Sequence, residues 1–449
     1  MRIRQGLGLS MCLIAVFLLF LCCFIFNTIA IASPYGYVTN SESDNVSVID
    51  IATNTVIGTI PTGDRPIGVA WSPLGTEVYV TNVNSGTVSV IDTITNTVTA
   101  TIGVGTWPLG VGATPDGSRL YVSNMLSSSV SVIDTSTNMV IANIPVGGIP
   151  EGLVITPDGS KVYVPNGTGY YTSVISTATN TVIATIPTGN YAQGVAVNPD
   201  GTRVYIGNHL DHNVSVVDTS TNSIIATVAN VPWPGGIVVD PTGTLVYAAG
   251  DRQVTIIDTG TNNVIGAIPL VPSGPQIPCW GLGISITPDG SSIYVAQPDQ
   301  NFVSVFDTSN NSLITTIPVG LNPRAFGAFI GEPVPKPITI DIKPGSNPNS
   351  INLKSKGVVP VAVLTTEDFD ASTIDPSTVK FAGASPLRWT MEDVDGDGDT
   401  DMGFHFETQE LNLDEQSTEA TLIGLTYGGM PFQGKDTVNI VPKGKGKEK

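Results

Sequence analysis

Short apolar, β-branched runs alternate along this chain with corners of Gly, Pro, Asn and Asp. In residues 67–102 the runs cover 67–71, 77–82, 88–92 and 97–102, and polar turns separate them. Runs of this length between turn residues predict β-strands. The pattern therefore predicts an all-β chain built from units of four strands, which we letter A to D in chain order.

A recurring tetrapeptide sets the length of this unit. It reads Tyr-Val-Thr-Asn in its first two copies and falls on strand B. Seven copies begin at Tyr37, Tyr79, Tyr121, Tyr163, Tyr205, Tyr247 and Tyr294. Neighbouring tyrosines lie 42 residues apart five times and 47 apart once. A period of this size is typical of one four-stranded propeller blade per repeat, so we expect a seven-bladed β-propeller.

Both ends of the repeat region are incomplete. It opens with a strand B at Tyr35, with no strand A before it, and ends with a single strand A at 325–330. A propeller avoids an open sheet edge when its last strand completes its first blade. The incomplete ends therefore predict a one-plus-three strand closure.

The repeats resemble the YVTN family of β-propellers. The resemblance rests on the tetrapeptide and on the run Val-Ser-Val-Ile-Asp at 46–50, and it covers residues 35–331. The chain departs from the family pattern at 247–250, at Ser176 in place of the usual Asp, and in the lengthened segment 272–279. This family is known chiefly from archaeal surface-layer proteins and exported bacterial proteins. The resemblance therefore implies an extracellular, surface-associated propeller.

The first 32 residues have the features of a secretory signal peptide. Arg2 and Arg4 precede the apolar stretch 11–26, and Ala-Ile-Ala at 30–32 is a small-x-small cleavage site. We therefore expect residues 1–32 to be removed on export and the mature chain, without a membrane span, to reach the cell surface. The alternative is a retained N-terminal anchor, because the apolar stretch approaches membrane-spanning length.

The net charge and the cysteine content limit the kinds of partner and of internal cross-link that we expect. The chain carries a formal charge of −19 at pH 7. Nucleic acid and anionic membranes would be repelled at long range, so we expect neither as a partner. Three of the four cysteines lie in the N-terminal segment, which leaves Cys279 alone and excludes an internal disulfide in the exported form. The expected partner is a cell-envelope protein or polysaccharide.

A second region follows the repeats. A proline-rich linker, 332–337, precedes β-branched runs across 338–441 whose spacing is typical of a β-sandwich, and a basic tail occupies 442–449. The opening of this region resembles an accessory module found at the C-termini of secreted archaeal and bacterial proteins. That resemblance implies no particular activity.

An acidic loop in this region has the spacing of a calcium site. The pattern D-x-D-x-D-G-x-x-D supplies several oxygen ligands and no soft ligand, which favours Ca²⁺. The predicted ligand residues are Asp393, Asp395, Asp397, Asp399 and Asp401. Phe404 stands where a helix-loop-helix site needs Glu, so we expect the loop to join two strands, as in the calcium hairpins of integrin-type propellers. The alternative is a solvated acidic turn.

Propeller ligands bind at one end of the central channel, which the D–A and B–C loops surround. Candidate ligand-binding residues are therefore those at which the repeats differ within these loops. The residue before strand A is aromatic in several repeats, which suits stacking on sugars or clamping a peptide. The predicted ligand-binding residues are Arg65, Trp107, Glu151, Tyr191, Trp233, Trp280 and Arg324. The alternative is that these aromatic side chains cover blade seams and plug the channel.

Catalysis has weaker support in the sequence. His209 and His212 share one B–C loop, but a catalytic zinc needs a third protein ligand, so we expect a solvated loop there. No nucleophile elbow or phosphate-binding loop is found. A hydrolase or lyase at the channel mouth, similar to the seven-bladed lactonases, is the enzymatic alternative, with Asp64, Glu151 and this histidine loop as its candidates.

Overall fold

A computed structural model describes residues 34–250, 252–270, 282–427 and 430–441. Within these ranges the chain is all-β, with three single-turn 3-10 helices and no α-helix: η1 (Pro298–Gln300), η2 (Ala371–Thr373) and η3 (Thr408–Glu410). The predicted fold class is confirmed. Among the described residues no helix is long and apolar enough to cross a membrane. The expected signal peptide and the basic tail lie outside the described residues.

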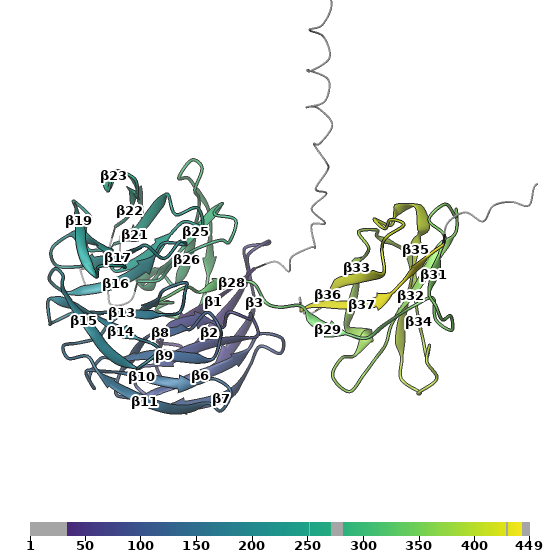
Figure 1. Ribbon diagram of the computed structural model, residues 1–449, viewed down its shortest axis with the longest axis horizontal. Coiled ribbons are helices and arrows are strands. Elements are labelled where there is room, and N and C mark those ends of the chain that lie inside the picture. Colours follow the sequence, from purple (N-terminus) through teal and green to yellow (C-terminus); the bar gives the residue numbers. More distant parts are fainter. Residues whose placement is uncertain (1–33, 251, 271–281, 428–429, 442–449) are drawn as a thin grey trace, which may run out of the picture. The chain divides into compact units, whose positions relative to one another are not determined.

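The described repeats form seven four-stranded antiparallel sheets arranged around an axis, which we number as blades 1 to 7 (Figure 1). Blade 1 contains β28 (Ile330–Gly331), β1 (Tyr35–Asn40), β2 (Asn45–Asp50) and β3 (Thr55–Pro61). Blade 2 contains β4 (Pro66–Trp71), β5 (Glu77–Asn82), β6 (Thr87–Asp92) and β7 (Thr97–Gly103). Blade 3 contains β8 (Pro108–Ala113), β9 (Arg119–Asn124), β10 (Ser129–Asp134) and β11 (Met139–Pro145).

The remaining blades follow the same order of strands A to D. Blade 4 contains β12 (Val154–Ile155), β13 (Lys161–Asn166), β14 (Tyr171–Ser176) and β15 (Thr181–Pro187). Blade 5 contains β16 (Ala192–Val197), β17 (Arg203–Asn208), β18 (Asn213–Asp218) and β19 (Ser223–Ala229). Blade 6 contains β20 (Gly236–Val239), β21 (Leu245–Ala249), β22 (Gln253–Asp258) and β23 (Asn263–Pro269). Blade 7 contains β24 (Ile284–Ile286), β25 (Ser292–Gln297), β26 (Phe302–Asp307) and β27 (Leu313–Pro318).

Blade 1 has the predicted one-plus-three composition, but its last strand is shorter than expected. Only Ile330 and Gly331 pair with β1 as a strand, rather than the whole of 325–330. Ala325 and Gly327 have φ angles of 48° and 127°, which interrupt the extended backbone. Phe326 therefore turns toward the channel and packs with apolar side chains of blade 2.

In several repeats the tyrosine of the tetrapeptide joins neighbouring blades. The Tyr121 hydroxyl donates to Asn180 Oδ1 at 2.7 Å, and the Tyr163 hydroxyl donates to Asn222 Oδ1 at 2.6 Å. Each acceptor lies in the C–D turn of the next blade and has a φ angle above 50°, a conformation that Asn tolerates. Tyr294 donates in the same way to Asn54, which links blade 7 to blade 1.

The asparagine of the tetrapeptide holds loops within its own blade. Asn82 Oδ1 accepts the Gly63 N–H at 3.2 Å, and its Nδ2 donates to Thr87 and Ser89. Gly63 belongs to the D–A loop that leads into the same blade. The tetrapeptide is therefore structural at both polar ends.

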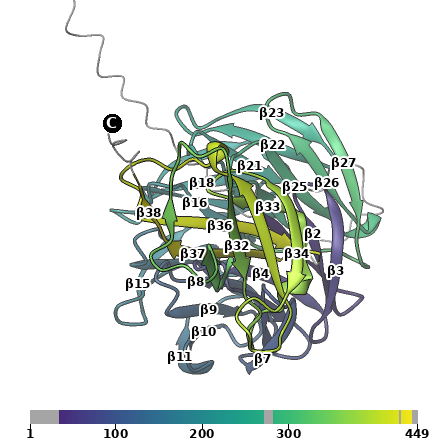
Figure 2. The ribbon, with the colours of Figure 1, turned by 90° about the vertical axis from the view of Figure 1, so that its right-hand side faces the viewer.

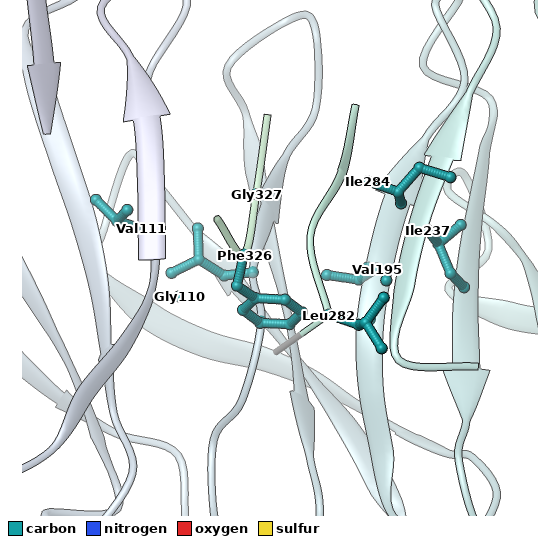
Figure 3. A pocket seen from close by; sticks show the side chains of 12 residues that line it. Gly110, Val111, Val195, Ile237, Leu282, Ile284, Phe326 and Gly327 are labelled. Carbon is teal, nitrogen blue, oxygen red and sulfur yellow. The ribbon is translucent and has the colours of Figure 1, made fainter. Parts of the chain in front are cut away.

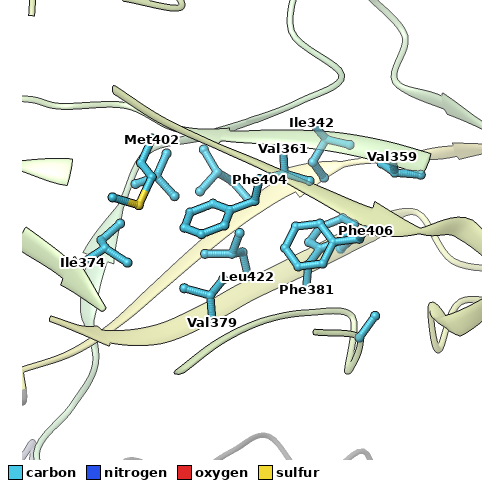
Figure 4. Close-up of a cluster of buried hydrophobic side chains, with 14 of the residues drawn as sticks. Ile342, Val359, Val361, Ile374, Val379, Phe381, Met402, Phe404, Phe406 and Leu422 are labelled. Carbon is cyan, nitrogen blue, oxygen red and sulfur yellow. The ribbon is translucent and has the colours of Figure 1, made fainter. Parts of the chain in front are cut away.

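The C-terminal region forms two four-stranded sheets that share one core (Figure 4). One sheet has the order β29 (Lys336–Ile338), β37 (Pro431–Thr437), β36 (Glu419–Thr426) and β33 (Ile374–Phe381) (Figure 2). The other has the order β30 (Ile340–Ile342), β32 (Val358–Val363), β35 (Asp401–Glu407) and β34 (Pro386–Glu392). A two-stranded sheet pairs β31 (Ser350–Ile351) with β38 (Asn439–Ile440). Because β29 starts at Lys336, the last two residues of the expected linker are already part of a sheet.

Candidate functional site

The D–A loops place one residue per blade in a left-handed backbone conformation just before strand A. The φ angles are 58° at Arg65, 55° at Trp107, 55° at Tyr191, 50° at Trp233 and 55° at Asn322. In four of these loops the carbonyl of this residue accepts the first N–H of the B–C loop, and the donors are Ser41, Val83, Met125 and His209. Blade 4 differs, because Gly148 has the positive φ angle and Ile149 supplies the carbonyl.

A left-handed conformation is unfavourable for bulky residues by about 1–2 kcal/mol each, whereas Gly and Asn tolerate it. Blade 1 uses Asn322 at this position, so the loop itself does not require a large side chain. The side chains of Trp107, Tyr191 and Trp233 are therefore kept for a reason other than backbone geometry. They come from the face that the D–A and B–C loops form, which we call the mouth.

Trp107 has both a packing contact and a polar neighbour. Its half-buried ring packs on the apolar cluster of Ile67, Val83, Leu109 and Phe326. The Arg65 guanidinium lies 5.8 Å from the centroid of the same ring, within the range of a cation–π contact. Trp107 thus covers a blade seam and also presents an aromatic face.

Aromatic rings also run across the mouth from blade 5 to blade 6. The His209 ring lies 6.1 Å from Tyr191 and 5.3 Å from Trp233 between centroids. The His212 ring meets Trp233 edge-on at 4.3 Å, and His212 Nδ1 accepts the Trp233 backbone N–H at 3.2 Å. The sequence-based expectation of a solvated histidine loop is wrong for His209, which is 3% exposed because it is enclosed by these two aromatic residues.

Glu151 is the most perturbed acid near the mouth. It is 1% exposed, and burial raises its pKa to about 8, while a hydrogen bond from Tyr191 acts in the opposite direction. Burial, followed by the charge of Glu151, also raises the pKa of Tyr191. Next to it, Gln193 is fully buried, and within the described residues neither atom of its side-chain amide has a hydrogen-bond partner. The structure therefore brings Glu151 and Tyr191 together, as a neighbouring pair with Gln193.

The other predicted mouth residues are more dispersed. Arg324 is half-buried on the closing strand segment of blade 1, at the strand-A position that Glu151 occupies in blade 4. Asp64 is exposed, and its Oδ1 accepts from Asn84 at 3.1 Å. Trp280 lies outside the described residues.

The channel beneath the mouth is narrow and is lined by glycines and apolar side chains. It contains a cavity of about 40 Å³ lined by strand-A residues, among them Gly110, Gly152, Gly194, Leu282, Ile284 and Phe326 (Figure 3). A space of this size holds a few water molecules at most, whereas ligand pockets typically measure about 300–1,000 Å³. The ring that fills the channel is that of Phe326, a residue that the sequence did not single out, rather than the predicted aromatic residues of the D–A loops.

The acidic loop joins β34 to β35. Oxygen atoms of Asp393, Asp395 and Asp401 lie within 4.8 Å of one another. Asp401 is 1% exposed, and its two oxygens accept the N–H groups of Thr365 and Val394, each at 2.8 Å. Desolvation raises the pKa of the exposed Asp395; the Asp397 N–H, which donates to it, lowers this pKa, and the neighbouring carboxylates of Asp397 and Asp401 raise it.

The loop backbone is folded around Asp393. Its two carboxylate oxygens accept the N–H groups of Gly396 and Gly398, whose φ angles are 83° and 99°. Asp397 and Asp399 do not join the carboxylate cluster in this arrangement, since Asp397 Oδ1 accepts the backbone N–H of Asp399. The set of donors consists of oxygen alone and fits a hard divalent cation.

Comparison with solved structures defines the class of protein as a β-propeller. Hydrazine synthase of Kuenenia stuttgartiensis matches with a TM-score of 0.51 and 23% identity over 58% of this chain and 88% of the other. A functionally unknown protein of Desulfotomaculum acetoxidans DSM 771 matches with a TM-score of 0.59 and 17% identity over 66% of this chain and all of the other. Dihydro-heme d1 dehydrogenase NirN in complex with DHE matches with a TM-score of 0.50 and 14% identity, over 66% and 74% of the two chains. These identities show a shared fold alone.

Sequence comparison adds little to this. No family model matches the chain. The uncharacterized protein YwhL of Bacillus subtilis (strain 168) is 48% identical over 42 residues, which is 9% of each chain. The matched length equals one repeat, and it spans far less than two thirds of that relative.

Proposed function

We propose that this chain is an exported propeller of the YVTN type, associated with the cell surface or envelope, that binds a partner through its mouth. The observation that carries the proposal is the use of Trp107, Tyr191 and Trp233 at left-handed positions where Asn322 suffices in blade 1. Retaining bulky side chains at a backbone cost is typical of binding sites. Export rests on the N-terminal sequence, and the proposed partner is an envelope protein or polysaccharide.

The binding role is tested with the full chain on arrays of envelope glycans and peptides. Trp107→Asn and Trp233→Asn keep a residue that this backbone conformation accepts. Each is expected to reduce retention at least tenfold while the chain still unfolds in one cooperative transition. Met139→Ala, at a 63% exposed position on the outer strand β11, is the matched control and should bind normally. If both Trp variants lower the melting temperature and bind like the parent, the rings serve packing alone.

We also propose that the acidic loop holds a structural Ca²⁺ ion. Asp393, Asp395, Asp397 and Asp401 would supply carboxylate oxygens, and Asp399 would supply its backbone carbonyl. Support comes from the clustered oxygens of the three residues that already converge and from the burial of Asp401. Bound Ca²⁺ would neutralise these charges and stiffen the β34–β35 hairpin, with a dissociation constant on the order of 10⁻⁴ to 10⁻³ M, as in extracellular modules.

A lactonase-like hydrolase or lyase is the second candidate, favoured by the raised pKa of Glu151, a feature often found in general acids. The small cavity beneath the mouth counts against a substrate entering the channel. Turnover of a lactone and glycan panel at low protein concentration, abolished by Glu151→Gln, would establish this candidate in place of a binding role.

A further inference from the structure

The side chains beneath the mouth loops form a layer around the channel. One part of this layer is apolar and another is polar, and we call them the apolar sector and the polar sector. Each blade contributes the residue that aligns with Ile67 of blade 2 and the first residue of the B–C loop. In blades 2 and 3 these positions include Ile67, Val83 and Leu109, which pack together with Trp107 and Phe326. In blades 4 and 5 the same positions, each one repeat of 42 residues further on, hold Glu151, Gly167, Gln193 and His209.

The equivalence of these positions is visible in their hydrogen bonds. The Val83 N–H binds the carbonyl of Arg65, and the Gly167 and His209 N–H groups bind the carbonyls of Ile149 and Tyr191 in the same way. The apolar sector therefore shows what packing alone requires at this depth. A buried carboxyl and a buried amide in the polar sector make the fold less stable than the Ile and Leu of blades 2 and 3 would.

Polar atoms of Glu151 and Gln193 lack hydrogen-bond partners within the described residues. Glu151 Oε1 and both polar atoms of the Gln193 amide make no hydrogen bond, although Glu151 is 1% exposed and Gln193 is fully buried. A Cβ atom placed on Gly167 would lie 3.2 Å from Glu151 Oε1 and 3.5 Å from the Tyr191 ring. Because Gly167 has no side chain, this position of the B–C loop places no side chain against Glu151 Oε1.

The charges around Glu151 favour a cation. The basic residues of blades 4 and 5 are Lys161 and Arg203, and both donate to carbonyls of C–D turns at the other end of strand B. Asp211 is exposed in the neighbouring B–C loop, where its carboxylate accepts the N–H of Asn190 at 2.7 Å. The arginines on the mouth side belong to other blades: Arg65, Arg252 and Arg324.

We propose that Glu151 and Gln193, beneath Tyr191 and Trp233, bind an organic ammonium group. The ammonium N–H groups would donate to Glu151 Oε1 and to Gln193 Oε1, and the aromatic rings would face its alkyl chain and its charge. The ligand reaches Glu151 when the half-buried Tyr191 ring turns aside. This inference rests on the proposed binding role of the mouth and names the chemistry of its ligand.

Binding of a cation is coupled to the loss of a proton. Burial raises the pKa of Glu151 to about 8, so this group is mostly protonated at pH 7 in the free protein. The groups that face it are Tyr191 and Gln193 from the D–A loop and β16, with His209 behind Tyr191. Since an ammonium ion selects the carboxylate, affinity should rise with pH up to about 8, and close to one proton should be released per ligand at pH 7.

The test is calorimetry of the full chain with n-butylammonium at pH 7, in phosphate and in cacodylate, with n-butanol as the neutral probe. We expect binding of butylammonium alone, with a buffer-dependent heat that reports about one proton released. Glu151→Leu, the residue type that Leu109 supplies in blade 3, and Glu151→Gln should each weaken binding at least tenfold and remove the proton release. Glu42→Gln, which removes an exposed mouth carboxylate in blade 1, is the matched control and should bind like the parent.

Two sources of the ammonium group are distinguished with the same variants. A lysine-containing peptide, its acetylated form and the free polyamine spermidine are compared, and selective binding of one class identifies the source. Retention of an array ligand by the parent chain without any butylammonium heat would overturn the ammonium inference and leave the proposed binding function standing. Equal weakening by Glu151→Leu and Glu42→Gln would also overturn it, because general charge attraction would then explain the binding.

Discussion

Replacement of Glu151 by Gln should change how the stability of the propeller depends on pH. Glu151 has an ordinary pKa of 4.5 in the unfolded chain and a pKa of about 8 in the folded protein, because burial disfavours the charged form. For an acid whose pKa is raised by folding, stability is greatest below pH 4.5 and is lost as the pH rises through 8. Gln has the same shape and does not titrate, so this loss should be absent in Glu151→Gln.

The size of the effect follows from the two pKa values. One pKa unit corresponds to about 1.36 kcal/mol, so the penalty is about 1 kcal/mol at pH 5 and about 4 kcal/mol at pH 8. The difference between wild type and Glu151→Gln should therefore change by about 3–4 kcal/mol over this interval. With an unfolding entropy of about 2.1 cal/mol/K per residue over about 300 residues, it corresponds to roughly 5 °C in melting temperature.

The measurement is a pair of calorimetric melts at pH 5 and pH 8, in amine-free buffers, for wild type and Glu151→Gln. The remaining acids and His405 titrate in both proteins, so their contributions cancel in the difference. The variant should melt progressively higher than wild type as the pH rises. Parallel melting curves at both pH values would show that Glu151 is solvated, and the argument for a buried polar sector would fail with it.

Four further changes test separate parts of the structure. Phe329→Ala, at a fully buried residue before the closing strand, should lower stability by about 3–5 kcal/mol, or roughly 5–8 °C, and an unchanged melting temperature would contradict the closure. Tyr121→Phe removes the inter-blade bond to Asn180 and should lower stability by about 1 kcal/mol in denaturant melts, while a neutral result would mean that the bond makes no net contribution. Asp395→Asn should weaken Ca²⁺ binding at least tenfold in calorimetry, whereas Asp399→Asn, which keeps the backbone carbonyl, should not. In ligand retention assays Trp233→Asn should lose binding without losing cooperative unfolding.

The repeated part of the fold could be predicted because its polar contacts are local to the repeat. The hydroxyl of Tyr121, for example, meets an Asn in the next C–D turn, and the same two residue types recur at the same spacing in other blades. Each copy therefore predicts the same four strands, and the Pro, Asp and Gly residues of the turns mark where these strands end. The pKa values of Asp116, in an A–B turn, and Asp134, in a C–D turn, are lowered because neighbouring hydroxyl and N–H groups donate to these carboxylates.

The candidate site was only partly predictable. Alignment of the repeats identified Glu151 and Tyr191, but the burial of His209 depends on rings from two different blades. Phe326 could not be identified as the channel side chain, because the left-handed Ala325 and Gly327 that direct it belong to a segment without a counterpart in the repeats. The sequence did contain one sign of the polar sector. Leu109 and Glu151 occupy equivalent positions in their repeats, although one is apolar and the other is acidic.

Blades 4 and 5 also lack a contact that blades 2 and 3 make, as do blades 6 and 7, where Ala249 and Ala296 stand at the position of Thr81. In blades 2 and 3 a hydroxyl on strand B, from Thr81 or Ser123, accepts an N–H of its own strand A and donates to the strand-A carbonyl of the next blade. Blades 4 and 5 have Pro165 and Gly207 at this position, which cannot make either bond.

In blade 4 the pattern of the tetrapeptide asparagine changes as well. Asn166 Oδ1 has no hydrogen-bond partner, whereas Asn82 and Asn208 each hold a glycine of the D–A loop. The loop that leads into Glu151 is instead held by other donors, since the Tyr171 and Ser128 hydroxyls donate to the carbonyls of Val146 and Gly148. A stretch of wall with fewer cross-links and unpartnered buried groups can rearrange around a ligand at lower cost than blades 2 and 3. Departures from the repeat in loop conformation, in hydrogen bonding and in side-chain chemistry thus occur in the same part of the ring. For this reason we propose a binding site at blades 4 to 6 rather than around the whole mouth.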